Sequence, residues 1–463
     1  MTIFKRSAIF PLIEAALSVW PISRLVGLAS AYIAYPIAEK MENRSVKKKV
    51  NELRVFYALP AIERDLIAKE RLVNIIDFAA HQVPYYRDLF KQLKIDSQKI
   101  KKDVAYLNEL PYLTKEVIRE QGARMFSRPL DEVRHHVCKT GGSTGPSCFI
   151  YYDQVAADHS AAITLYARER VGKVKSYSEL HFACRFPDTK VLTEWFTRED
   201  FKCFAMNRTN IFCDRLDEIG LQQIIQILNR RKSFLVHSHP STMYALACYA
   251  KAQGGIHKLF SIFESSGELL ENYQRELIAS VLQCSVIDRY GLAELGVTAY
   301  QLDGSKGALQ VFESECWAES AALDGEAPNL QELVFTGFQN HLMPLIRYRT
   351  GDLGQIKRNQ SGVFLENVIG RIHDQIPING INHPTHYIQD ILDHRVGGIQ
   401  EFQIDLRTLP PKLRIVTESS ELTEQISQKI NQLWGNAFKL EFVSHADLIR
   451  VGRHAKFRHV VTA

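Results

Sequence analysis

The sequence predicts an α/β protein: a large N-terminal domain with parallel sheets and a β-rich subdomain, and a small α+β C-terminal domain. Two patterns carry this prediction. Between residues 234 and 288, short apolar runs typical of strands alternate with helical stretches, as in a parallel sheet. From residue 333 onward the pattern becomes β-rich, and residues 370–463 read as a separate unit. At about 150 residues per domain, a chain of 463 residues accommodates this division.

The N-terminal part is expected to be helical over residues 42–125, because apolar side chains recur there at helical spacing among charged ones. The segment at Val83 and Pro84 interrupts that pattern. We therefore place domain boundaries after residues 82 and 369. The chain divides into a helical and apolar segment (1–82), a large domain (83–369) and a small C-terminal domain (370–463).

The remaining elements follow in order along the chain. In the large domain we expect strands at 234–237, 259–263, 286–288, 333–336 and 362–365, and helices from Pro240 to Ala250 and from after Glu268 to Leu282. In the small domain we expect helices at 386–394 and 421–434 and strands at 402–406, 412–417 and 438–443.

The composition is that of an ordinary globular protein, with 46% hydrophobic and 24% charged residues. It excludes a wholly disordered chain, a collagen-like chain and a disulfide-rich miniprotein. A net charge of +5 without a concentrated basic face does not favour a nucleic-acid partner. No two of the 8 cysteines form a C-x-x-C pair, which argues against a zinc ribbon and indicates reduced thiols in a cytoplasmic protein.

Residues 8–38 are unusually apolar, with Glu14 and Arg24 as their only charges. The longest uncharged run, residues 25–38, is shorter than the about 20 residues that a membrane span requires. Three interpretations stay open. The segment packs on the protein's own core, or it lies in a membrane interface through Trp20, Tyr32 and Tyr35, or it spans the membrane. The second would place the protein in the cytoplasm, peripheral to the inner face of the membrane.

A glycine-rich loop is the strongest local signal, Thr140-Gly141-Gly142-Ser143-Thr144-Gly145-Pro146. Its glycines allow close approach of the backbone, and its N–H groups and hydroxyls can surround anionic oxygens. It is not a Walker A loop, because no lysine follows Gly145. A solvated surface turn is the competing interpretation of this loop taken alone.

Further motifs follow the loop in a fixed order: Tyr290-Gly291-Leu292-Ala293-Glu294, Tyr348-Arg349-Thr350-Gly351-Asp352-Leu353, Gly370-Arg371-Ile372-His373-Asp374, and Lys456-Phe457-Arg458. In this order and spacing the set resembles the adenylate-forming superfamily of acyl-CoA synthetases, adenylation domains and luciferases. Within it the chain is most similar to the phenylacetate-CoA ligase and CapK branch. The phrases at residues 83–87 and 110–115 resemble that branch too, and the resemblance covers residues 83–458.

The resemblance implies an ATP-dependent acid–thiol ligase with a small-molecule carboxylic acid as substrate. The acid would first form an acyl-adenylate with release of pyrophosphate, and the acyl group would then pass to the thiol of CoA. ATP, Mg²⁺ and CoA are the implied cofactors. Two alternatives stay open: acyl transfer to an amine or a carrier-protein thiol, and a degenerate adenylate-binding protein without activity. The sequence specifies neither the acid nor the oligomeric state.

The resemblance also assigns roles to the phosphate site. The loop residues would cradle the β- and γ-phosphates of ATP, through Thr140, Gly141, Gly142, Ser143, Thr144 and Gly145. Glu294 matches the metal-binding glutamate, and a carboxylate oxygen suits Mg²⁺. Lys456 matches the C-terminal catalytic lysine, whose ammonium would bridge the carboxylate and the α-phosphate.

The nucleoside site is implied in the same way. Ser266, Gly267 and Glu268 resemble the loop along the adenine edge, and Tyr290 with Gly291 matches the aromatic position that stacks on adenine. Asp352 matches the residue that accepts hydrogen bonds from the ribose hydroxyls, and Arg371 a second ribose or phosphate contact. His373 occupies the hinge of the mobile C-terminal domain, where relatives usually carry Asp or Lys. His237 and Tyr244 are candidate walls of the acyl pocket.

Overall fold

The computed structural model describes residues 19, 21–140, 148–182, 198–211, 218–255, 258–302, 307–322, 331–369, 375–384, 388–389, 391–444, 447–451, 456–457 and 459–461. A helical N-terminal region comes first, with α2 (Ile22–Ala29), the π-helical turn η1 (Ser30–Ala34), α3 (Tyr35–Met41), α4 (Val46–Ala58), α5 (Ala61–Gln82), α6 (Pro84–Leu93), α7 (Ser97–Lys102) and α8 (Lys115–Gln121). As expected from the sequence, the chain breaks between α5 and α6 at Val83, because Pro84 begins the next helix.

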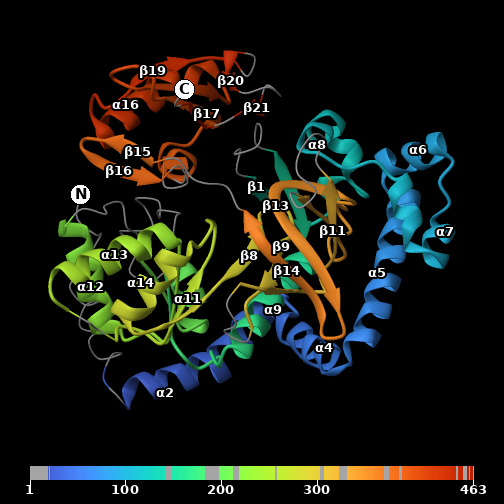
Figure 1. The fold of residues 1–463 in the computed structure, drawn as a ribbon, viewed down its shortest axis with the longest axis horizontal. Coiled ribbons are helices and arrows are strands. Elements are labelled where there is room, and N and C mark those ends of the chain that lie inside the picture. Colours follow the sequence, from blue (N-terminus) through green and yellow to red (C-terminus); the bar gives the residue numbers. More distant parts are fainter. Residues whose placement is uncertain are drawn as a thin grey trace.

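A parallel sheet of β4-β3-β5-β6-β7 forms the first half of the large domain. Its strands are β3 (Glu179–Phe182), β4 (Arg208–Ile211), β5 (Leu235–Ser238), β6 (Ile262–Ser265) and β7 (Ser285–Ile287). The helices α12 (Glu218–Arg231), α13 (Pro240–Ala252) and α14 (Asn272–Leu282) cover one face, through buried side chains such as Val236 and Phe263. The helix α9 (Gln154–Arg170) covers the other face, so the sheet is sandwiched between helices (Figure 1).

An antiparallel sheet follows in the order β11-β12-β13-β14-β10-β9-β8. Its strands are β8 (Arg289–Leu292), β9 (Gly296–Tyr300), β10 (Leu309–Val311), β11 (Cys316–Ala322), β12 (Gln331–Gly337), β13 (Tyr348–Asn359) and β14 (Gly362–Ile369). The chain passes from the parallel sheet to this one across a single residue, Asp288, between β7 and β8. The two sheets therefore meet where the Tyr290 motif lies.

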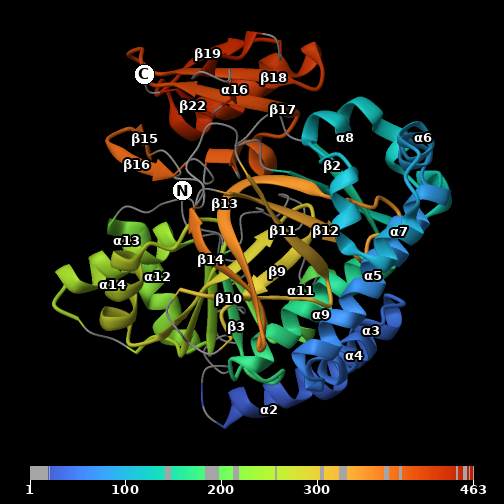
Figure 2. The same cartoon turned by 45° about the vertical axis from the view of Figure 1, so that its right-hand side comes forward.

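The C-terminal domain lies above the large domain in both cartoon views (Figures 1 and 2). It begins with a hairpin of β15 (Gln375–Ile378) and β16 (Ile381–Pro384), followed by a sheet of order β19-β18-β17-β22. That sheet contains β17 (Ile399–Asp405), β18 (Lys412–Thr417), β19 (Lys439–Phe442) and β22 (Val460–Val461), and α16 (Thr423–Trp434) packs on it. The short pair β20 (Arg450–Val451) and β21 (Lys456–Phe457) completes it.

Several boundaries differ from the sequence prediction, and two of the differences are informative. The strand expected from residue 259 begins at Ile262, because Leu259 and Phe260 are buried in the preceding loop and apolar character alone does not distinguish the two. In the expected helix 386–394, the described residues 388–389 and 391 are α-helical, and the helix continues as a π-helical turn, η5 (Leu392–Val396), which ends at Gly397 with a φ of +70°. The α/β fold class with a small α+β domain is confirmed.

The N-terminal helices α4 and α5 share the cores of the large domain. Val50 and Leu53 of α4 pack with α9, and Leu72 and Ile76 of α5 belong to the cluster that contains Tyr348. Helices of residues 46–82 therefore pack as part of the large body. No helix among the described residues has the length and apolarity that crossing a membrane requires.

Arg168 on α9 holds together a buried ionic network behind the parallel sheet. Its guanidinium lies 2.6 Å from Glu264 and 3.2 Å from Glu179, and all three side chains are at most 3% exposed. Arg168→Met is expected to lower the free energy of unfolding by about 3–5 kcal/mol, because it leaves buried carboxylates uncompensated. Arg54→Met, which breaks an exposed pair with Glu169, should cost less than about 1 kcal/mol. Denaturant unfolding of both variants checks this; equal losses would contradict it.

Candidate active site

Tyr290 and Asp352 are joined directly, although they lie in different motifs. The Tyr290 hydroxyl on β8 donates a hydrogen bond of 2.8 Å to Asp352 Oδ2 on β13. The Asp352 backbone N–H donates to Thr350 Oγ1 at 3.0 Å, which fixes the bend of the motif, and Gly351 between them has a φ of +79°. The aromatic residue and the carboxylate predicted to hold adenine and ribose are thus in contact, although three strands separate β8 from β13 in the sheet order.

Glu294 lies in the turn between β8 and β9 and is 6% exposed. Its Oε1 accepts a hydrogen bond of 2.7 Å from the Tyr348 hydroxyl and lies 3.5 Å from Lys115 Nζ. Tyr348 begins β13, the strand that carries Asp352. The same strand therefore positions the candidate metal ligand and the candidate ribose ligand.

Lys115 reaches Glu294 because its segment docks on β13 like an extra strand. Leu113 pairs in parallel with Tyr348, its N–H donating to Arg347 O and its carbonyl accepting from Arg349 N–H, both at 2.9 Å. Lys115 then opens α8 behind the N-cap Thr114, and it is 5% exposed. A cation at the first position of a helix interacts unfavourably with the helix dipole. The favourable interaction of Lys115 is therefore the one with the Glu294 carboxylate.

The glycine-rich loop is anchored beside this pair. Thr140 N–H donates to Cys148 O at 2.8 Å, and Cys148 N–H donates to Thr140 Oγ1 at 2.9 Å, which ties together the two ends of the loop. Burial raises the pKa of the Cys148 thiol, and the charges of Lys115 and Glu294 also act on it. Cys148 is therefore an uncharged structural thiol rather than a nucleophile. Gly141, Gly142, Ser143, Thr144 and Gly145 lie outside the described residues, so their role stays a prediction.

Lys139, which directly precedes the glycine-rich loop, contacts the C-terminal domain. Lys139 ends β1 (His135–Lys139), which pairs with β2 (Phe149–Asp153). Its Nζ lies 2.7 Å from Asp393 Oδ1 and donates to Ile399 O at 3.0 Å, both in the C-terminal domain. The C-terminal domain thus closes over the part of the large domain that carries the loop (Figure 2).

The segment Ser266, Gly267 and Glu268 follows β6 at the carboxyl edge of the parallel sheet. Ser266 N–H donates to Ser238 O, and His239 Nδ1 donates to Ser266 O at 2.8 Å. Gly267 has a φ of +84°, and a Cβ there would lie 2.4 Å from the His239 ring. The packing of His239 therefore requires glycine, and it brings the Gly267 backbone to the edge where ligands of parallel sheets bind.

The two candidate acyl-pocket residues have different surroundings. His237 lies one residue before the end of β5, near the same sheet edge, and its Nδ1 is 2.7 Å from Glu264 Oε2. Burial lowers the pKa of His237, against the effect of that carboxylate. Tyr244 lies on α13, where its ring meets Tyr273 of α14 edge-on at 5.3 Å. The structure brings His237, but not Tyr244, into contact with the network beneath the site.

Three of the predicted site residues belong to the C-terminal domain. Arg371 and His373 lie outside the described residues, and of Lys456 only the backbone is described, paired with Val451. Their roles stay predictions.

Glu294 is the candidate ligand for Mg²⁺ among the residues that the structure describes. Among the described residues no group of three His, Cys, Asp or Glu side chains gathers to form a closed metal site. Mg²⁺ usually binds one or two carboxylates together with substrate phosphates, and a buried carboxylate with one oxygen held by Tyr348 suits that mode.

The sequence of the chain is similar to those of two known proteins. No family model matches the chain. The chain is 23% identical over 318 residues to protein CapK of Staphylococcus aureus, covering 66% of this chain and 68% of CapK. It is 25% identical over 342 residues to phenylacetate-coenzyme A ligase of Pseudomonas putida, covering 70% and 74%.

The fold of the chain is also similar to that of solved structures. Two crystal structures of 2-hydroxyisobutyryl-CoA ligase superpose with TM-scores of 0.54 and 0.56 at 18% identity. They cover 88% and 87% of this chain and 90% of the ligase. The first holds R3-HIB-AMP in the postadenylation state, and the second 2-HIB-AMP and CoA in the thioesterification state. The chain has the fold of the adenylate-forming ligases. The resemblance to this superfamily and to its phenylacetate-CoA ligase and CapK branch is thereby confirmed.

Sequence reasoning missed two residues of this candidate site. Lys115 was visible only as part of a phrase typical of the branch, and Tyr348 only as the first residue of the Asp352 motif. Both touch Glu294. The unfavourable place of Lys115 at the start of a helix, directly behind a threonine N-cap, was the one signal that could have found it.

Proposed function

We propose that the protein activates a carboxylic acid with ATP and transfers the acyl group to the thiol of CoA. The observation that carries this proposal is the joining of the predicted motifs. Glu294 and Asp352 are held by one strand, with Tyr290 on Asp352 and Lys115 on Glu294. The relatives named above, which include CoA ligases, support it.

In the first step, the carboxylate oxygen attacks the α-phosphorus of ATP. The bond to the bridging oxygen breaks, and pyrophosphate leaves. In the second, the CoA sulfur attacks the acyl carbon, its proton passes to solvent, and AMP leaves. A Mg²⁺ ion on Glu294 would neutralise phosphate charge, and Lys115 adds a cation that the glycine-rich loop itself lacks. Tyr290 and Asp352 would hold adenine and ribose.

The test is product analysis with a panel of carboxylic acids. The purified protein is incubated with ATP, Mg²⁺ and each acid, with and without CoA, and AMP, pyrophosphate and acyl-CoA are quantified. We expect an acid that yields AMP and acyl-CoA in equal amounts. If an acid yields its adenylate but no thioester, the acceptor is not CoA, and an amine or a carrier-protein thiol takes its place in the proposal. No AMP with any acid would favour a binding protein without activity.

We further propose that the protein contacts the inner face of the cytoplasmic membrane through α2, η1 and α3. One side of this helical segment packs on the body: Ala31 and Ala34 are buried, and a Cβ on Gly27 would lie 2.1 Å from Ser176 O. The other side leaves large apolar side chains exposed, namely Ile22, Leu25, Leu28, Tyr32, Ile33, Ile37 and Met41. An apolar stripe of this size on a surface helix suits a membrane interface.

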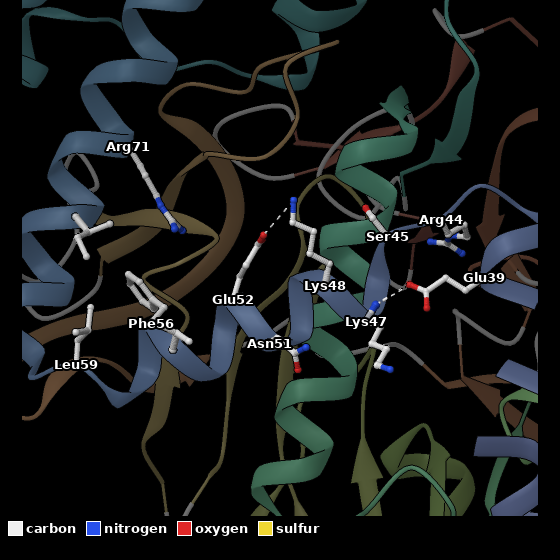
Figure 3. A pocket seen from close by; sticks show the side chains of 12 residues that line it. Glu39, Arg44, Ser45, Lys47, Lys48, Asn51, Glu52, Phe56, Leu59 and Arg71 are labelled. Carbon is white, nitrogen blue, oxygen red and sulfur yellow. Dashed lines mark hydrogen bonds and ion pairs between the residues drawn. The ribbon is translucent and has the colours of Figure 1, made fainter. Parts of the chain in front are cut away.

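Basic side chains follow the stripe along the chain. A hollow of about 890 Å³ beside α4 and α5 is lined by Arg44, Lys47, Lys48 and Arg71 against Glu39 and Glu52 (Figure 3). Its excess of positive charge complements anionic headgroups.

Replacing Leu25 and Ile33 by glutamate is expected to weaken binding to anionic vesicles at least about tenfold, because burying one such side chain is worth about 1.5–3 kcal/mol. Co-sedimentation with phosphatidylglycerol vesicles measures it. Ile219→Glu, at an exposed apolar residue of α12, is the matched control and should bind like the wild type. Equal binding of both variants, or no binding by the wild type, would contradict the proposed contact.

A further inference from the structure

Three basic side chains gather at the carboxyl edge of the parallel sheet, next to the candidate nucleotide site. His181 on β3 and His237 on β5 are paired in register, and their rings lie 4.9 Å apart. Arg289 begins β8, and its Nη1 lies 3.9 Å from Glu264 Oε2. Ligands of such sheets bind at this edge, and Arg289 directly precedes Tyr290. The trio therefore borders the place where an acid would meet ATP.

A fully buried ionic floor lies beneath the trio. Glu264 accepts from Arg168 and from the Tyr300 hydroxyl at 2.6 Å, and Glu179 lies 2.8 Å from Lys173 Nζ. Burial lowers the pKa of His181 to about 3, against the effect of Glu179, and lowers that of His237 as well. Both imidazoles are therefore neutral, and the two carboxylates face the three permanent cations Arg168, Lys173 and Arg289.

Of the three cations, Arg289 has the weakest contact with the buried carboxylates. Arg168 makes close contacts with both carboxylates, whereas Arg289 keeps only the longer approach to Glu264. Its Nε is buried and has no hydrogen-bond partner within the described ranges. The adjacent Asp288 does not supply one: its carboxylate accepts from the Arg289 backbone N–H and from Ser265, and its charge partner is Arg275. A buried N–H group in this state lacks an acceptor.

The histidines offer the complementary group. His181 directs Nε2 to Glu179 at 3.3 Å, and His237 directs Nδ1 to Glu264 at 2.7 Å. Neither contact has hydrogen-bond geometry, but in a neutral imidazole the nitrogen that faces a carboxylate carries the proton, so the other nitrogen carries a lone pair. The side chains of His181, His237 and Arg289 are 17–20% exposed, whereas those of the floor are at most 3% exposed. The trio is thus the more accessible part of this network, and it combines the N–H donors of a guanidinium with two imidazole acceptors.

We propose that His181, His237 and Arg289 bind a hydroxyl group on the acyl part of the substrate, so that the protein selects hydroxylated carboxylic acids. A hydroxyl can accept from the guanidinium and donate to an imidazole at once. A second carboxylate would satisfy Arg289 but meet the imidazole lone pairs, and a purely apolar acyl group would satisfy neither. This inference rests on the proposed function, since it names the class of acid for the same site.

The test compares matched acids that differ by one hydroxyl. We expect kcat/KM for adenylation to favour the hydroxy acid over its deoxy analogue by about 100-fold or more, as in sites built to bind a substrate hydroxyl. Arg289→Met should reduce this ratio to within a few-fold of one, and Arg289→Lys should retain part of it. Arg124→Met, at an exposed arginine paired with Asp88, should keep the wild-type ratio. His237→Asn gives a second measurement of the ratio if Arg289→Met does not fold.

The outcomes separate the two proposals. A wild-type preference for the deoxy acid or for a dicarboxylate would overturn the hydroxyl inference, and so would an Arg289→Met variant that loses activity with both acids alike. Absence of acid-dependent AMP formation with every acid would instead refute the proposed function itself.

Discussion

Glu294→Gln is expected to lower the rate of pyrophosphate formation by about 100-fold or more, with the fold intact. The neutral amide keeps the shape and the hydrogen bond from Tyr348, but it loses the charge that would hold Mg²⁺ against the phosphates. It also leaves Lys115, which is 5% exposed, without its carboxylate. Initial rates of pyrophosphate release at saturating ATP, over a series of Mg²⁺ concentrations, measure the effect.

Two further variants show how the surroundings of Glu294 act. Tyr348→Phe removes only the hydroxyl that orients the carboxylate, so we expect a smaller loss of about tenfold, relieved in part by higher Mg²⁺. Lys115→Met should raise KM for ATP, because it removes a cation beside the phosphate loop. A Glu294→Gln variant that forms pyrophosphate within threefold of the wild type would remove Glu294 from the proposed mechanism.

Lys456→Ala is expected to abolish adenylation while leaving the second half-reaction measurable. The resemblance places this ammonium between the attacking carboxylate and the α-phosphate, and truncation removes a charge needed only in that first step. We therefore predict no acid-dependent pyrophosphate release, together with thioester formation from a chemically prepared acyl-adenylate and CoA. The pair of assays separates a catalytic defect from unfolding.

Lys439→Ala provides the matched control for Lys456. Lys439 lies on β19 of the same small domain and has an exposed side chain. Its removal should leave both half-reactions unchanged. Pyrophosphate release by Lys456→Ala at the wild-type rate, or equal losses in the two variants, would contradict the assignment of Lys456.

The local sequence pattern was sufficient to predict helices and strands in which apolar residues recur with a clear period. The strand at 412–417 and the helix ending at Trp434 are found where they were predicted, because turns flank them and their apolar residues share one face. The predicted helix at 386–394 is helical at its described residues, but its last turn is π-helical rather than α-helical and runs to Val396, before a glycine. Periodicity does not distinguish these two ways of burying the same side chains.

The candidate site was predictable only as a set of motifs. Order and spacing identified Glu294, Tyr290 and Asp352, and the structure joins Tyr290 to Asp352. The partners of Glu294 and the floor under Arg289 depend on contacts between distant segments, such as Arg168 with Glu264, 96 residues apart. A charged residue in a strand pattern reads locally as an exposed position, whereas Glu264 is fully buried because a distant arginine neutralises it.

The most direct test of the central claim is isotope exchange between pyrophosphate and ATP in the absence of CoA. Exchange isolates adenylation, because label enters ATP only if an enzyme-bound acyl-adenylate forms and reverts. The proposed function predicts that the exchange depends on a carboxylic acid and on Mg²⁺ and disappears in Glu294→Gln. Exchange that proceeds without any acid, or no exchange with an acid that binds the protein, would contradict it.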